Sequence, residues 1–281
     1  MSAAALTISQ SSLQDYSDCP RRFKLRYLDA LQYPGIESQP LAEYERLQEQ
    51  GRHFHRMAHQ FVLGIPDEMI LAGSGSPDLE RWWGEFVSFY KSELGDAREV
   101  CPEMSLSAPL AAARLVAKFD LLAVYPDGRL RIYDWKTYRA RPRDEWLAAR
   151  WQTRVYRALL AQGGAQFQAG EPLDPGGIEM VYWFANFPEA PARFPYSSKQ
   201  FQRDWDALEL LGEEISAAAA AEGDADARFP MTEDLKRCRY CPYRGYCARG
   251  VQAGSLEDVE VEGEAEGAFD LDFEQIGEIA F

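Results

Sequence analysis

The chain has 281 residues, 46% of them hydrophobic and 13% aromatic, enough for a sizeable core in one large domain or two small ones. Its formal net charge of −15 argues against a simple electrostatic DNA binder. Residues 255–281, however, hold ten acids and no Lys or Arg, so residues 1–254 carry a net charge of only −5.

No targeting or membrane segment is visible in the sequence. The first residues lack the basic region and the long apolar run of a signal peptide. The longest stretch of small apolar residues, 215–221, is too short to span a bilayer. We therefore expect a soluble cytoplasmic protein, in which five cysteines indicate metal or redox chemistry rather than disulfides.

The first predicted elements are two short helices separated by Cys19-Pro20. Ser9 is a capping residue for the first helix, and the second is expected over residues 21–27. Cys19 would then lie at the bend between them. Either a metal-binding thiolate or a small buried side chain fits that position.

A long helix is predicted over residues 40–63, and it carries all three histidines of the chain. His55 and His59 share one face at i,i+4. No Glu follows His55, so this is not the His-Glu-x-x-His motif of zinc proteases, and the default role of a helical histidine is structural. Gly51 lies one turn before His55 and suggests that this helix closely approaches another element, for which the hairpin described below is a candidate.

The next predicted elements are a Gly- and Ser-rich loop over residues 66–77, an aromatic helix over residues 78–94 and a strand over residues 99–109. The aromatic stripe of the helix is more typical of a core than of a base-stacking platform. In the strand, Cys101 and Glu103 share one face, and Cys101 is most simply a core residue.

Two strands over residues 113–125 and 129–137 form a predicted hairpin, joined by a Pro-Asp-Gly turn. Asp120 lies on the first strand and Asp134 on the second. Lys136 shares the face of Asp134, because side chains in a strand alternate with period two. Two carboxylates that can hold a hard cation, with a lysine beside them, are typical of metal-dependent hydrolysis, although Asp-x-Lys alone is also common in ordinary ion pairs.

A helix is predicted over residues 143–162, with Gln152 and Tyr156 on one face, followed by a flexible connection, a strand over residues 178–185 and a helix over residues 197–221. The order helix–helix–strand–strand–strand–helix–strand–helix predicts an α/β fold with a small mixed central sheet flanked by helices.

The most specific local signal is Cys-x2-Cys-x5-Cys, formed by Cys238, Cys241 and Cys247. A closed site requires a fourth ligand, for which Cys19 is the candidate. Four cysteines suit zinc or an iron–sulfur cluster, and both remain open. The sequence contains no P-loop and no Gly-x-Ser-x-Gly motif.

Taken together, these motifs resemble the RecB-like, iron–sulfur branch of the PD-(D/E)XK nuclease superfamily. This branch includes AddB-type repair nucleases and CRISPR adaptation exonucleases. The resemblance spans about residues 5–250 and includes the following motifs in the family's order: Ser9-x-Ser with Cys19-Pro20, Gly51-x3-His55, Phe119-Asp120, Asp134-Trp-Lys136-Thr137, Gln152-x3-Tyr156 and the three clustered cysteines. Ala117 replaces a glycine that is usual in relatives, and the acidic tail is not part of the pattern.

The resemblance implies a restriction-endonuclease-like core over residues 1–250, followed by an acidic tail over residues 255–281 that we expect to be disordered. His55, Asp120 and Asp134, with the carbonyl of Trp135, would bind Mg²⁺ or Mn²⁺. The implied roles of the other residues are these: Lys136 as the catalytic lysine, Gln152 and Tyr156 positioning DNA or water, Glu103 as a further possible acid, and Cys19, Cys238, Cys241 and Cys247 holding a [4Fe–4S] cluster that joins the chain ends.

We therefore predict a metal-dependent DNA nuclease, an exonuclease on single strands or duplex ends, with a helicase or a CRISPR or repair protein as partner. One alternative is a catalytically idle RecB-like fold that binds DNA ends. Three costly polar groups on one face argue against it. Another alternative is a zinc-stabilised protein-interaction module, which the colour of the purified protein would distinguish. The tail, with large apolar residues interleaved among its acids near residue 281, is either merely solvated or a docking segment for a partner or for the DNA groove.

Overall fold

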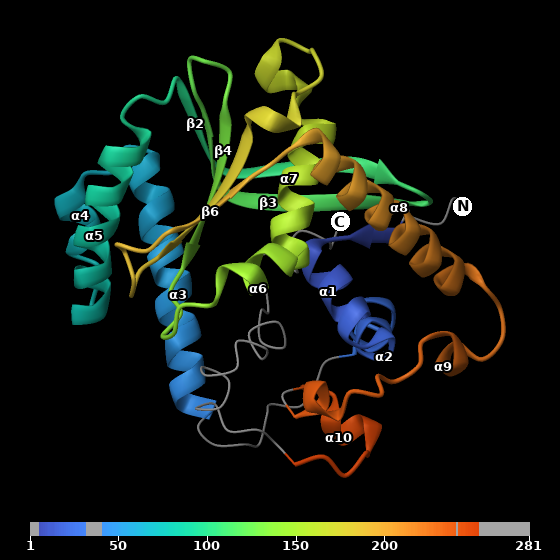
Figure 1. Cartoon of the computed structure of the whole chain (residues 1–281). Helices are drawn as coiled ribbons and strands as arrows, with labels where there is room; N and C mark the ends of the chain where they lie inside the picture. Colours follow the sequence, from blue (N-terminus) through green and yellow to red (C-terminus); the bar gives the residue numbers. More distant parts are fainter. Residues whose placement is uncertain (1–5, 32–40, 240, 253–281) are drawn as a thin grey trace.

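The computed structural model describes residues 6–31, 41–239 and 241–252. A mixed six-stranded sheet forms its centre, as predicted (Figure 1). The strand order is β1-β3-β4-β5-β6, with β2 also paired to β3. The pairs β1–β3 and β4–β5 are parallel and the others are antiparallel. The strands are β1 (Leu6–Ile8), β2 (Glu99–Leu110), β3 (Ala113–Val124), β4 (Leu130–Lys136), β5 (Ile178–Phe184) and β6 (Ala192–Pro195).

Helices cover both faces of this sheet. On one side lie α3 (Leu41–Val62), α4 (Asp67–Leu71) and α5 (Pro77–Leu94) (Figure 1). Their aromatic side chains, among them Phe54, Trp83 and Phe86, form a buried cluster with residues of β3, β4 and β5. The aromatic stripe predicted in residues 78–94 is therefore core, because the rings interlock in edge-to-face contacts such as Phe54–Phe86 at 5.6 Å.

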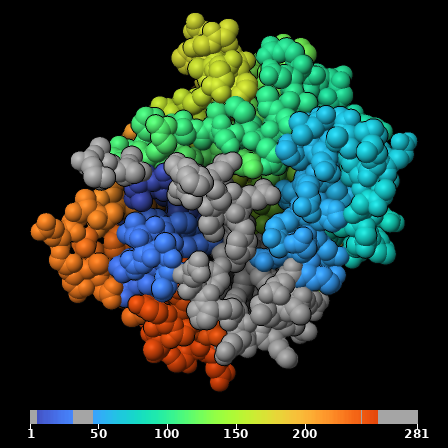
Figure 2. All heavy atoms as spheres, turned by 180° about the vertical axis from the view of Figure 1, so that it is seen from behind, coloured from blue at the N-terminus to red at the C-terminus, as the bar shows by residue number. Residues whose placement is uncertain are grey.

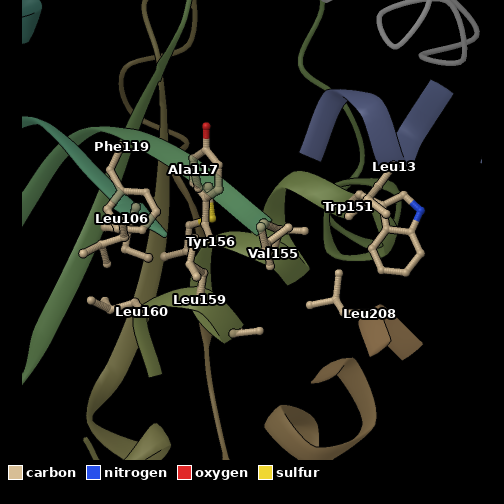
Figure 3. Packing of buried hydrophobic residues seen from close by; sticks show 14 of the residues in the cluster. Leu13, Leu106, Ala117, Phe119, Trp151, Val155, Tyr156, Leu159, Leu160 and Leu208 are labelled. Carbon is tan, nitrogen blue, oxygen red and sulfur yellow. The ribbon is translucent and has the colours of Figure 1, made fainter. Parts of the chain in front are cut away.

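On the other side lie α1 (Gln10–Asp18), α7 (Trp151–Gly163) and α8 (Ser198–Ala220). The second hydrophobic cluster joins these helices to the sheet, and Figure 3 shows α7 residues in this cluster beside Leu106 and Phe119 of the strands and Leu208 of α8. Val155 and Leu159 of α7 are fully buried. A helix placed this deeply has little freedom to move, which matters because it carries Gln152.

Several elements differ from the sequence prediction. The expected loop over residues 66–77 contains α4, which is anchored by a hydrogen bond from the Trp83 indole to Asp67. The single helix expected over residues 143–162 is two, α6 (Asp144–Ala149) and α7, because Arg150 has extended backbone angles. The short strands β1 and β6 were not predicted, since three or four residues carry too little periodicity to detect.

The two ends of the described chain meet at one corner of the molecule. There, the N-terminal elements are α1, α2 (Pro20–Phe23) and a π-helical turn (Lys24–Leu28), and the C-terminal ones are α9 (Ala225–Arg228), a 3₁₀ turn (Leu235–Cys238) and α10 (Arg244–Cys247). In Figure 2 the blue N-terminal segment lies against the red C-terminal segment. Hydrogen bonds such as Tyr243 OH to the Leu31 carbonyl, at 3.0 Å, hold them together.

The acidic tail over residues 255–281 lies outside the described residues. In the described part of the chain, none of the helices combines the length and the apolar character needed to cross a membrane.

Candidate active site

The predicted hairpin forms, and it brings its two aspartates to the same place. Backbone pairing of β3 with β4 runs from Val124–Leu130 to Leu121–Tyr133. Asp120 and Asp134 occupy the next position in this register, where no backbone pair is formed. The Asp120 carboxylate instead accepts a 2.7 Å hydrogen bond from the backbone N–H of Trp135. At the end of the ladder a side-chain carboxylate therefore replaces a backbone carbonyl as the acceptor.

Asp120 lies at an irregularity of β3. Phe119 belongs to the core cluster on one face of the sheet, whereas Leu121, two residues later, belongs to the cluster on the other face. In a regular strand these two side chains would share a face. Opposite on β2, Glu103 has a φ of +51°, an uncommon value for a non-glycine residue. This irregularity changes the direction of the Asp120 side chain relative to a regular strand, an effect that β-bulges also have near active sites.

Helix α3 contributes His55, whose Nδ1 lies 3.3 Å from Asp120 Oδ1. The helix reaches the hairpin because Gly51 has no side chain: a Cβ there would lie 3.0 Å from Thr137 Oγ1. The prediction that Gly51 marks a close approach to the hairpin is confirmed. Because Thr137 follows Lys136 directly, the glycine sets how near α3 comes to the site.

Asp134 and Lys136 share a face, as strand alternation predicts, and Lys136 Nζ lies 2.9 Å from Asp134 Oδ2. Both are buried. Gln152 of α7 connects them, because its Nε2 donates to Asp134 Oδ1 at 2.7 Å while its Oε1 accepts from Lys136 Nζ at 3.1 Å. A single amide thus fixes the orientation of both the carboxylate and the ammonium group.

Tyr156 was expected to position DNA or water, but only 3% of it is exposed. Its ring packs against Phe119 (Figure 3), and the ring centroids are 5.0 Å apart. Its hydroxyl lies 3.4 Å from Gln152 Nε2. Burial prevents direct contact with a large substrate. In this structure Tyr156 contacts the site through Gln152.

Sequence reasoning missed two residues beside Lys136. Tyr182 lies opposite Asp134 in the parallel β4–β5 register, and its hydroxyl contacts Gln152 Oε1 at 3.4 Å and Thr153 Oγ1 at 2.8 Å. The Lys136 ammonium lies 5.5 Å from the centre of the Tyr182 ring and 5.6 Å from that of Tyr138. A signal for Tyr182 was available only from the register of β4 with β5, which no local pattern gives.

The charges of the site perturb one another strongly. Burial raises the pKa of Asp134 to about 7, an effect that Lys136 opposes and Asp120 reinforces. Burial alone would lower the pKa of His55, but the Asp120 carboxylate outweighs it and the pKa rises to about 9. Burial would raise the pKa of Asp120, yet His55 and the Trp135 amide bring it below its ordinary value. Strongly perturbed groups clustered at one place are typical of functional sites.

Glu103, the further acid suggested by the resemblance, is engaged elsewhere. Its Oε2 lies 2.7 Å from Lys118 Nζ, and Lys118 is two residues before Asp120 on β3. Glu103 is thus linked to the strand of Asp120 through its ion pair with Lys118.

Four cysteines line one cavity at the corner where the chain ends meet. Its walls are formed by Cys19, Cys238, Cys241 and Cys247 together with Arg22, Leu25, Met231, Tyr243, Arg244 and Arg249. Cys19 caps the C-terminal end of α1, at the bend predicted from Cys19-Pro20. Burial raises the pKa of the Cys241 thiol to about 11, while the nearby Arg22 guanidinium opposes this.

Within the described residues, no group of three or more His, Cys, Asp and Glu side chains is arranged so that it could hold a metal ion as it stands. In the hairpin site, His55 and Lys136 pair with the two carboxylates. The four cysteines of the cavity are likewise not grouped in this way. The donor set of two carboxylates and one imidazole nevertheless suits Mg²⁺ or Mn²⁺ by its chemistry.

Comparison with known proteins identifies the family of the chain. The chain matches the family model of the PD-(D/E)XK nuclease superfamily over residues 7–248. The match covers most of the chain, and the protein belongs to this superfamily. Members typically use divalent metal ions.

Two solved structures are similar to this chain, and the first of them shares its fold. A chain from Eubacterium rectale, provisionally described as an exonuclease, is 9% identical, with 90% of this chain and 92% of that one aligned at a TM-score of 0.52. The protein SSO0001 is 14% identical over 88% of both chains, with a TM-score of 0.39. No curated protein matches the sequence significantly.

Proposed function

We propose that the protein is a metal-dependent DNA nuclease of the RecB-like branch, an exonuclease that acts on single strands or duplex ends and leaves 5′-phosphates. The observation that carries the proposal is the convergence of Asp120, Asp134 and Lys136 with His55 in one half-buried site of a PD-(D/E)XK chain. Three mutually oriented polar groups are expensive to bury, and cleavage chemistry gives them a use.

His55, Asp120 and Asp134, with the Trp135 carbonyl, would hold the Mg²⁺ or Mn²⁺. When bound, the cation supplies Lewis-acid stabilisation of the phosphate charge and a more acidic water. Asp134 lies buried beside Asp120, and burial raises its pKa to about 7, so a bound cation would favour its charged form.

Lys136 is the group of the chain best placed to assist the reaction. Its ammonium is held by Asp134 and Gln152, at 2.9 and 3.1 Å, so little reorganisation is needed when negative charge develops on the phosphate. Gln152 holds the lysine and the carboxylate in fixed positions relative to each other. The hydroxyls of Tyr156 and Tyr182 contact the Gln152 amide and help to fix it.

Cys19, Cys238, Cys241 and Cys247 would hold a [4Fe–4S] cluster. Their placement around one cavity, together with the arginines of its wall, supports the proposal. Such a centre would connect α1 to a segment more than two hundred residues later, and would act as a clip across a long loop. The nuclease domain would comprise residues 1–250, with a helicase or a CRISPR or repair protein as partner.

Digestion of end-labelled single- and double-stranded DNA tests this function. We expect mononucleotides or short products with Mg²⁺ or Mn²⁺ and none with EDTA. Binding of DNA ends without any cleavage, under every metal condition, would instead favour a catalytically idle end-binding subunit.

A further inference from the structure

The first turn of α7, which carries Gln152, is held by side chains from α1. Helix α7 has no side-chain cap of its own, because Arg150 makes no capping hydrogen bond. Instead the backbone N–H of Trp151 points to Gln14 Oε1, at 3.5 Å. The Trp151 indole N–H donates to Ser17 Oγ at 2.7 Å. Since Gln152 is the next residue, α1 determines where its side chain begins.

The orientation of Gln14 is set in turn by Asp18. Gln14 Nε2 donates to Asp18 Oδ1 at 3.0 Å. A side-chain amide has its donor on one end and its acceptor on the other. Fixing the nitrogen on Asp18 therefore directs the oxygen towards Trp151.

Asp18 is also where the two cysteine-bearing segments converge. It is buried, and it directly precedes Cys19. Its carboxylate binds Arg22 Nη2 at 2.8 Å and also pairs with Arg237, the residue before Cys238. Arg22 itself lines the cysteine cavity. A displacement of either segment would therefore change the contacts of Asp18 first.

We propose that Gln14 and Asp18 are positioning residues that couple the four-cysteine site to Gln152 through α1. The links form a continuous series of hydrogen bonds from Arg22 and Arg237 through Asp18 and Gln14 to the start of α7. From there Gln152 reaches Asp134 at 2.7 Å. This coupling deepens the proposed function and rests on it for its effect on cleavage, although the contacts themselves do not.

The consequence is that an intact four-cysteine site keeps the side chains of the reactive site in place. When the four-cysteine site loosens, Asp18 releases the Gln14 amide and the first turn of α7 loses its cap. Gln152 then no longer aligns Asp134 with Lys136. Helix caps and outer hydrogen bonds of this kind control how precisely a reactive group is placed.

A double-mutant cycle tests the route. Gln14→Met removes the amide at nearly constant volume, and we expect it to lower the rate of cleavage about tenfold, a value at the lower end for outer-shell partners. In a Gln152→Ala background the same change should add nothing, because the effect passes through Gln152. An equal loss in both backgrounds, or no loss in the wild-type background, overturns the proposal.

The matched control is Tyr16→Phe, which removes another hydrogen bond of α1, from the Tyr16 hydroxyl to Glu214 at 2.7 Å, without touching Gln14. We expect wild-type cleavage from this variant. A loss like that of Gln14→Met would mean that any loosening of α1 suffices, and would overturn the specific route.

Hydrogen–deuterium exchange gives a readout that needs no nuclease activity. We expect the amides of the first turn of α7 to exchange faster in Gln14→Met, with residues 235–247 unchanged. Asp18→Asn should accelerate exchange in both places. Unchanged α7 amides in both variants would overturn the coupling. A wild-type protein that cuts no DNA would refute the proposed nuclease function and leave this exchange test intact.

Discussion

Gln152 donates a 2.7 Å hydrogen bond to Asp134, and through this bond a helix on one face of the sheet holds a carboxylate at the end of a strand. Its other end accepts from Lys136 at 3.1 Å. The amide therefore contacts both groups, as a donor to Asp134 and as an acceptor from Lys136.

Replacing Gln152 with Ala should lower cleavage about 10- to 100-fold and raise the concentration of Mg²⁺ needed for half-maximal rate, because Asp134 and Lys136 lose their common partner. Steady-state cleavage of a labelled oligonucleotide across a Mg²⁺ series measures both effects. Gln202→Ala, on the exposed surface of α8, is the control and should behave as wild type. Unaltered metal dependence in Gln152→Ala would contradict the bridging role.

The parts of this site that the sequence predicts depend on local rules. Asp134 and Lys136 are two residues apart, so alternation along one strand suffices to place them together. The hairpin brings in Asp120 because its turn is short and distinctive. Gly51 indicated the approach of α3, since a glycine inside a helix usually has a packing reason.

The parts that the sequence does not predict depend on tertiary pairing. Tyr182 meets Asp134 only through the parallel register of β4 and β5, which a distant connection sets. The break in alternation at Asp120 could not be detected from the sequence, because the apolar residues on both sides of it continue the pattern of a strand. The separation of α6 from α7 at Arg150 likewise has no proline or glycine to mark it.

The cysteine prediction concerns colour and stability. We expect a brown protein when it is purified without oxygen, and we expect Cys19→Ser to destabilise it as much as Cys241→Ser. The two thiols lie at opposite ends of one long loop, so losing either opens the same clip. Thermal unfolding and iron content measure this.

Cys101→Ser is the matched control for both cysteine variants. Cys101 is half-buried on β2, away in sequence from the cysteines that line the cavity. Its Sγ lies 3.6 Å from Glu99 Oε1. It should be nearly silent. A colourless protein that contains one zinc ion would contradict the cluster and support a zinc site.

Two glycine-to-alanine changes in helices should have opposite effects. At Gly84 in α5 a Cβ meets nothing within 4 Å, so Gly84→Ala should stabilise the protein by about 0.5–1 kcal/mol through helix propensity. At Gly51 the Cβ would lie 3.0 Å from Thr137 Oγ1. Gly51→Ala should lose that gain and slow cleavage, because α3 must move away from the hairpin. Faster or equal cleavage with full stabilisation would contradict a tight contact here.

Truncation after residue 254 removes ten acidic residues and changes the net charge from −15 to −5. The shortened protein should bind DNA more tightly and cut it faster at low salt, and the difference should shrink as salt screens the charges. Rates measured across a salt series for both forms test this. Equal rates throughout would rule out restraint by the tail and leave partner docking or a solvated tail.

The central claim is that Asp134 and Lys136 carry phosphodiester cleavage, and the most direct test is the single-turnover cleavage rate of Asp134→Asn and Lys136→Ala on end-labelled DNA with Mg²⁺. Circular dichroism and a DNA-binding assay would show that each variant is folded, and Asp127→Ala, at the exposed hairpin turn, serves as the control. We predict a loss of about 10²–10⁴-fold for each site variant and none for the control. Digestion at the wild-type rate by either folded site variant would contradict the account.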